Sequence, residues 1–287
     1  MLPMALLEDL LRAALREDLG TGDTTVQALV PAGRWGRAEI ITRDAVRVAG
    51  GSVAFRVFHL LSSEVRAVSI LPEGTDADSG QVLLDLEGPM DALLMGERVA
   101  LNFLQHMCGV ATLTRRFVEA VAGTGVKILD TRKTLPGLRV LEKYAVRVGG
   151  GVNHRTSLSE GVLIKENHIL VCGGIRNAMR LARERLPQLL CVEVEARTTD
   201  EVDEALEAGA DVILLDNMDD RTIRSVVERV GGAVPLEVSG GVSLDRVRGL
   251  AMTGVDAISV GRLTHAAPGA DLSMLVRHVW SADAETE

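Results

Sequence analysis

Aromatic residues are scarce in this chain of 287 residues, which has four Phe, two Trp and one Tyr. Proteins that hold single-stranded nucleic acids by stacking need several aromatic side chains, so we expect no such surface here. The net charge of −9 also disfavours a general nucleic-acid-binding protein. No apolar run approaches the roughly 18 to 20 residues that cross a bilayer. We therefore expect neither nucleic acid nor a membrane as a partner.

Cysteine is also rare. Cys108, Cys172 and Cys191 are odd in number, lie far apart and form no C-x-x-C pair. This pattern disfavours a disulfide framework and a zinc site. The first residues include Glu8 and Asp9 within an apolar pattern and lack the basic stretch of a secretory signal. A reduced, cytoplasmic location is the expectation.

Lysine is the third scarce residue, because only four of the 31 basic residues are lysines. All four lie between Lys127 and Lys165, and the segment 127–168 carries eight basic and four acidic residues, a local charge of +4. Drift toward arginine would scatter lysines by chance. A compact ammonium group nevertheless has properties that arginine lacks, so the cluster is also consistent with a functional site.

The rest of the composition suits a folded protein, because 47% of the residues are hydrophobic. Residues 1–108 mix helical and strand-like patterns, which predicts an N-terminal α+β domain. After Gly109, short apolar runs alternate with helix-like stretches, which predicts parallel strands joined by crossover helices. The strand candidates are 126–130, 161–165, 191–195, 211–215, 235–238 and 256–260, with 151–155 as a weaker seventh.

Polar residues end each of these apolar runs, and this arrangement is typical of an α/β barrel, whose active site lies at the carboxyl ends of its strands. An open doubly wound sheet would instead concentrate its site at one switch point. The segment 109–268 is too short for the roughly 250 residues of eight βα units. We therefore expect an incomplete barrel of about seven strands.

Two basic motifs stand out. Arg132 and Lys133 follow the apolar run 126–130, and His154 and Arg155 follow the glycines at 149–151. Arginine grips carboxylate or phosphate with paired hydrogen bonds, and lysine acts as a point charge. The alternatives are a solvated loop with two exposed cations and a histidine with a structural role.

Further candidates follow the later runs. Lys165 could bind an anion or form a Schiff base, or it could be an ordinary surface lysine. Glu195 and Asp216 could bind sugar hydroxyls or a metal carried by a phosphate substrate, or they could balance nearby cations. Small-residue turns at 239–241 and around Gly261 could bind phosphate through backbone N–H groups.

In combination, these motifs resemble the quinolinate phosphoribosyltransferase family. The resemblance is carried by EDLGTGDTT (17–25), DTRKTLPGL (130–138), GGGVNHR (149–155), LIKENH (163–168) and the segments VEVEA, LLDNM, LEVSGG and SVGRLTH. It implies transfer of a phosphoribosyl group from phosphoribosyl diphosphate to quinolinate, which gives nicotinate mononucleotide, CO2 and diphosphate in NAD biosynthesis. It also implies Mg2+, an N-terminal sandwich domain rejoined by the tail 269–287, and a homodimer with shared active sites.

The resemblance also implies residue roles. Arg98 would reach the partner subunit's pocket, while Arg132, His154, Arg155 and Lys165 would hold the carboxylates of quinolinate. Lys133 would face the phosphates, and Glu195 and Asp216 would face the ribose and the metal. Catalytic roles are expected for Lys165, Glu195 and Asp216. The full set of expected substrate-binding residues is Arg98, Thr131, Arg132, Lys133, His154, Arg155, Lys165, Glu195, Asp216, Ser239, Gly240, Gly241 and Gly261.

Two other functions remain open from the residues. A barrel lyase would use Lys165 as a Schiff base. A non-catalytic paralogue, such as the one linked to molybdenum transport, would bind anions without turnover. The intact NHR and LIKENH segments argue against that paralogue.

Overall fold

A computed structural model describes residues 4–281, and these divide into two compact units. The first unit contains the described parts of 1–113, 136–149 and 267–287, and the second contains 114–135 and 150–266. Helix α4 (Met90–Ala120) contributes residues to both. Positions 282–287 of the tail considered above lie outside the described residues.

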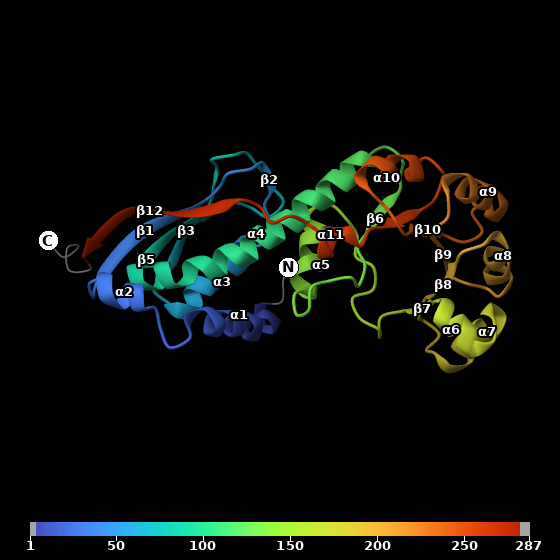
Figure 1. Cartoon of the computed structure of the whole chain (residues 1–287), viewed down its shortest axis with the longest axis horizontal. Helices are drawn as coiled ribbons and strands as arrows, with labels where there is room; N and C mark the ends of the chain where they lie inside the picture. The colour runs from blue at the N-terminus through green and yellow to red at the C-terminus, as the bar shows by residue number, and fades with distance from the viewer. Residues whose placement is uncertain (1–3, 282–287) are drawn as a thin grey trace. The chain divides into compact units, whose positions relative to one another are not determined.

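The first unit is built on an antiparallel sheet with the strand order β12-β1-β5-β3 (Figure 1). Alternate residues of β1 are buried, as expected for a strand with one covered face. Helix α3 contacts strands β3 and β5, and α1 contacts α3. The bounds are α1 Met4–Leu19, α2 Thr24–Leu29, β1 Arg34–Thr42, β2 Val46–Arg47, α3 Gly51–Leu61, β3 Arg66–Ile70, β4 Asp76–Ala77, β5 Val82–Pro89 and β12 Leu272–Ser281.

The second unit contains a six-stranded parallel sheet with the order β6-β11-β10-β9-β8-β7. The first and last of these strands along the chain, β6 and β11, are neighbours, as they are in a barrel. A single parallel bridge joins Leu129 to Val152, at the position of the weak seventh strand. The strands are β6 Lys127–Leu129, β7 Val162–Ile164, β8 Val192–Ala196, β9 Val212–Asp216, β10 Leu236–Ser239 and β11 Ala257–Ser259.

This order confirms the expected fold class, an α/β protein with an incomplete barrel, because no pairing links Val152 to β7 among the described residues. Helices connect the strands and pack beside them (Figure 1). They are α6 Glu166–Cys172, α7 Ile175–Arg185, α8 Thr199–Glu207, α9 Asp220–Val230, α10 Leu244–Ala251 and the short α11 Arg262–His265. In residues 4–281, no helix combines the length and the hydropathy that a membrane crossing requires.

The segment 136–149, which the sequence interpretation placed in the barrel, groups with the first unit. It contains α5 (Arg139–Val148), whose fully buried Glu142 lies 2.9 Å from Nε2 of His106 on α4. The guanidinium of Arg47 also donates to the carbonyl of Val148. Because a buried carboxylate is costly without partners, these contacts hold α5 against the first unit.

Candidate active site

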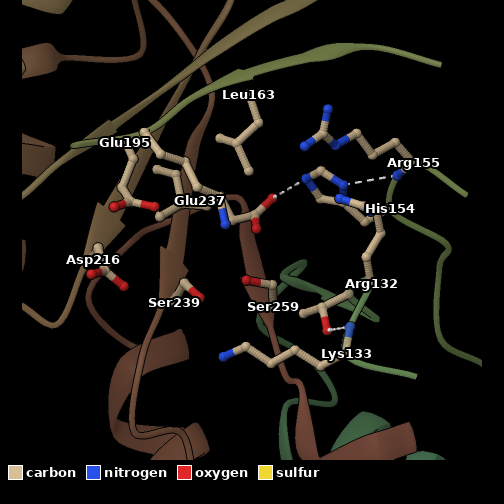
Figure 2. Close-up of a pocket in the computed structure, with 13 residues that line it drawn as sticks. Arg132, Lys133, His154, Arg155, Leu163, Glu195, Asp216, Glu237, Ser239 and Ser259 are labelled. Carbon is tan, nitrogen blue, oxygen red and sulfur yellow. Dashed lines mark hydrogen bonds and ion pairs between the residues drawn. The ribbon is translucent and has the colours of Figure 1, made fainter. Parts of the chain in front are cut away.

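A cavity of about 310 Å³ opens at the carboxyl ends of the parallel strands, within the second unit. Its size is within the range of small-ligand pockets. Figure 2 shows cationic side chains from the loops and acidic side chains from the strands facing the same space. The lining residues are Thr131, Arg132, Lys133, His154, Arg155, Leu163, Lys165, Glu195, Leu214, Asp216, Glu237, Ser239 and Ser259.

The strands place several of these residues directly. Asp216, Ser239 and Ser259 are the last residues of β9, β10 and β11, and Lys165 follows β7. Ser239 pairs with Asp216 in the register of the sheet, so the two lie side by side. Because parallel strands all end at one edge, chemistry-bearing residues distant in sequence are brought to one mouth.

Nine of the sequence candidates line the cavity, and four do not. Gly240 and Gly241 form the turn after β10, where both have positive φ. Gly261 lies just outside, since a Cβ there would be 2.9 Å from Cδ of Lys133. Arg98 is an exposed residue of α4 in the first unit and does not line this cavity.

The cationic wall carries charge without carboxylate partners. Among residues 4–281, neither Arg132 nor Arg155 forms an ion pair, and Nε of Arg132 is buried without a hydrogen-bond partner. The guanidinium of Arg155 donates to the carbonyl of Gly161 at 2.8 Å. Burial, and then the nearby charge of Arg132, lower the pKa of Arg155. Two close cations that form no ion pair in the described residues favour the binding of an anion between them.

A buried aspartate fixes the loop that carries this wall. Asp130 follows β6, is fully buried, and accepts hydrogen bonds from the backbone N–H of His154 at 2.8 Å and from Nδ2 of Asn153 at 2.5 Å. Both donors belong to the segment 150–155, so Asp130 joins the two loops that contribute cations to the cavity.

The ring of His154 is oriented by two contacts inside the protein. The backbone N–H of Arg155 donates to Nδ1 at 2.8 Å, and Nε2 lies 2.9 Å from Oε2 of Glu193. Because Nδ1 accepts a proton donor, the geometry assigns the ring proton to Nε2. His154 therefore lines the cavity with both ring nitrogens engaged by protein groups, and its anion-holding role stays a prediction.

The acidic wall is formed by Glu195 and Asp216. Burial, and then the charge of Asp216, raise the pKa of Glu195. Arg197, which the sequence interpretation missed, lies 3.7 Å from Glu195 and 3.6 Å from Asp216 and also pairs with Glu166 at 2.6 Å. Two neighbouring carboxylates are suited to polyhydroxylated or cation-bearing ligands.

Four other lining residues were missed: Leu163, Leu214, Glu237 and Ser259. The leucines read simply as strand residues. Glu237, however, is a charged residue inside the apolar run 235–238. Burying a carboxylate in a strand costs free energy unless the group is paired or has a function. The position of Glu237 in this apolar run was therefore the sequence signal for a site residue.

Comparison with known proteins gives a consistent result. The family model described as "Quinolinate phosphoribosyl transferase, C-terminal domain" matches residues 110–275, and the corresponding N-terminal-domain model matches residues 23–108. A "probable nicotinate-nucleotide pyrophosphorylase [carboxylating]" of Bacillus subtilis is 42% identical over 268 residues, which cover 93% of this chain and 92% of the relative. The nicotinate-nucleotide pyrophosphorylase [carboxylating] of Mycobacterium leprae is 43% identical over 272 residues, which cover 93% of this chain and 95% of the relative.

Solved structures agree with these relatives. The crystal structure of NadC from Streptococcus pyogenes has a TM-score of 0.93 at 37% identity and covers 98% of this chain and 99% of that one. The nicotinate-nucleotide pyrophosphorylase from Francisella tularensis has a TM-score of 0.92 at 38% identity and covers 96% and 98%.

Proposed function

Because the chain belongs to the quinolinate phosphoribosyltransferase family, we propose that the cavity at the carboxyl ends of its parallel strands is where its two anionic substrates meet. The chain is an enzyme of NAD biosynthesis. It transfers a phosphoribosyl group from phosphoribosyl diphosphate to quinolinate, and it releases CO2 and diphosphate to leave nicotinate mononucleotide.

The observation that carries the placement is the pair of uncompensated guanidinium groups. Arg132 and Arg155 lie together on one wall with no carboxylate partner in residues 4–281. Quinolinate has two carboxylates on adjacent ring carbons. We assign these carboxylates to Arg132, Arg155 and the ammonium group of Lys165. His154 positions Arg155 through its contact with that residue's backbone N–H.

The phosphoribosyl group lies along the other side of the cavity in this proposal. The hydroxyl of Ser239, the N–H groups of Gly240 and Gly241 and the ammonium group of Lys133 bind phosphate oxygens. Consecutive positive φ angles at the two glycines support this, because such a turn presents backbone N–H groups to an anion. Thr131 stabilises the loop, since its Oγ1 accepts the backbone N–H of Lys133 at 3.0 Å. Gly261 leaves room for the Lys133 side chain.

Glu195 and Asp216 face the ribose. Their hydrogen bonds to the ribose hydroxyls orient the anomeric carbon toward the ring nitrogen, and their negative charge stabilises the positive charge that develops as diphosphate leaves. Once the ring nitrogen carries the ribose, its positive charge accepts the electron pair released as CO2 departs. No residue has to act as a nucleophile in this route.

We propose Mg2+ as the cofactor. The residues fit this ion, because burial and then the charge of Asp216 raise the pKa of Glu195, and a nearby cation would offset both effects. Mg2+ keeps several waters and binds through substrate phosphates, so the two carboxylates would hold its water shell. When bound, it neutralises the leaving diphosphate.

A Schiff-base lyase is disfavoured, because Lys165 is exposed, whereas a Schiff-base lysine is typically desolvated. The direct test measures CO2 from carboxyl-labelled quinolinate together with nicotinate mononucleotide, with nicotinate as the control acceptor. We expect equimolar products that require phosphoribosyl diphosphate and Mg2+, and none with nicotinate. Binding of quinolinate without turnover would instead identify a non-catalytic anion-binding protein.

We also propose a homodimer in which Arg98 completes the partner subunit's cavity. The support is that Arg98 is exposed and belongs to the unit that does not contain the cavity. Mixing Arg98→Ala with Lys165→Ala under exchange conditions should restore activity toward a quarter of the wild-type value, because one site of each mixed dimer is intact. No recovery despite exchange would contradict this role. The cytoplasmic location stays a prediction, to be tested by cell fractionation.

A further inference from the structure

Glu237, which lines the cavity, forms a buried acidic pair with Glu193. Single ligand atoms of His154, Glu193 and Glu237 lie within 4.8 Å of one another. Glu193 is 5% exposed and Glu237 is 3% exposed. Oε1 of each glutamate is buried without a hydrogen-bond partner in the described residues. Figure 2 shows Glu237 directed toward His154, whose Nε2 lies 3.8 Å from its Oε2.

The histidine is within hydrogen-bond distance of Glu193 but lies farther from Glu237. Its Nδ1 accepts the backbone N–H of Arg155, and its proton on Nε2 points to Glu193. Both ring nitrogens are thus engaged by groups of the protein. The same arrangement leaves Nε2 without a lone pair for a metal ion, which argues against a metal site here.

A proton is therefore the simplest counter-charge. Burial, and then the charge of Glu193, raise the pKa of Glu237 to about 7. Three residues from other elements face Glu237. They are Ser259 on β11, Glu193 on β8 and His154 in the loop after Val152. Oε2 of Glu193 lies 2.9 Å from Nε2 of His154, so this glutamate already has a hydrogen-bond partner. Glu237 therefore gains and loses its proton near neutral pH, where an ordinary glutamate is fully ionised.

Glu237 also touches three separate spaces. It lines the substrate cavity and a cavity of about 520 Å³ at the amino ends of the strands, which is bounded by Lys127, Val212 and Asp256. It lines a third space beside the unpaired edge of β7. A proton lost from Glu237 into the substrate cavity can thus be replaced from another side while that cavity is filled.

The reaction needs such a donor. When the bond between ring carbon 2 and its carboxylate breaks, CO2 leaves and the electron pair stays on carbon 2. We propose that Glu237 protonates this carbon, as the general acid of the decarboxylation step. The Glu237 O–H bond breaks, a C–H bond forms at carbon 2, and the resulting carboxylate takes a proton from water in the amino-end cavity. This inference rests on the proposed function of the cavity.

The first test compares Glu237→Gln with Glu228→Gln, which makes the same change at an exposed position of α9. Glu237→Gln should lower kcat for CO2 formation about 100-fold, because general acids contribute on that scale, while Kd for quinolinate changes less than threefold. In a single turnover, diphosphate should appear before CO2. Wild-type kcat and simultaneous release in Glu237→Gln would overturn the proposal.

The second test uses Glu193→Gln, which removes the charge beside Glu237 but leaves the acid in place. In the wild type, kcat should fall as pH rises through the pKa of Glu237. In Glu193→Gln this fall should begin at lower pH, because Glu237 loses its proton more easily. If Glu237 has only a structural role, the pH at which kcat falls should be the same in Glu193→Gln and the wild type. That result would overturn the proposal even if Glu237→Gln does not fold. A wild-type protein that forms no nicotinate mononucleotide would instead contradict the proposed function.

Discussion

The fully buried carboxylate of Asp130 accepts the backbone N–H of His154 at 2.8 Å. The two residues are 24 positions apart, and their contact joins the end of β6 to the segment around Val152, which also forms a parallel bridge to Leu129. Both cationic loops of the site start from this contact, so the geometry of the guanidinium pair depends on a residue that does not line the cavity.

Asp130→Ala should therefore affect stability and binding together. The change leaves buried donors on Asn153 and His154 without their acceptor, which costs about 3 kcal/mol of the free energy of unfolding. KM for quinolinate should rise as well, because Arg155 follows His154 in the loosened loop. Urea unfolding and steady-state kinetics measure the two effects. Asp18→Ala, at an exposed position, is the control. An equal urea midpoint for both variants would show that Asp130 does not stabilise the two loops.

Gly240→Ala should destabilise the second unit. Gly240 has φ +93°, and a Cβ there would lie 2.1 Å from Oδ1 of Asn217 and 3.0 Å from its backbone nitrogen. Backbone strain and this clash together should cost about 3 kcal/mol. Gly232→Ala is matched, because Gly232 has φ +80° but no atom within 4 Å of the added Cβ. Thermal unfolding of both separates the clash from the strain, and equal losses would show that the Asn217 contact has no effect.

Gly261→Ala should weaken the binding of substrate and leave the stability of the fold nearly unchanged. Gly261 has φ −60°, which alanine adopts freely. The added Cβ would crowd the flexible side chain of Lys133 at 2.9 Å and would make an ordinary contact with His265 at 3.5 Å. Unfolding should change by less than about 0.5 kcal/mol. KM for phosphoribosyl diphosphate should rise roughly tenfold, equivalent to about 1.4 kcal/mol, as Lys133 is displaced. Gly269→Ala, in open space, is the control. An unchanged KM would show that Gly261 and Lys133 do not belong to the phosphate site.

The barrel strands could be predicted because each is a short apolar run with a polar residue at its end. The run 211–215 corresponds to β9 at Val212–Asp216, and 235–238 to β10 at Leu236–Ser239. The grouping of α5 with the first unit could not be predicted, since it depends on the contact of Glu142 with His106, 36 positions away. Local periodicity contains no information about such a pair.

The site shows the same division. Residues in dense motifs, such as Arg132 and Arg155, were identified because several chemistry-bearing types follow one another. Glu237 stands alone in an apolar run, and only the order of the strands in the sheet brings it near Glu193, 44 positions earlier. The orientation of the His154 ring likewise depends on a backbone N–H whose direction no sequence pattern specifies.

Arg197→Met should shift the acid limb of activity upward in pH. Arg197 lies within 4 Å of both Glu195 and Asp216, and its charge lowers the pKa of Glu195 against the raising effects of burial and Asp216. Glu195 works as a carboxylate, so activity is lost as pH falls through its pKa. Without Arg197 that pKa is higher, and kcat/KM for phosphoribosyl diphosphate should begin to fall at a higher pH than in the wild type. Arg197→Lys keeps the charge and should retain the wild-type limb. Coincident limbs for Arg197→Met and Arg197→Lys would show that the guanidinium does not control Glu195.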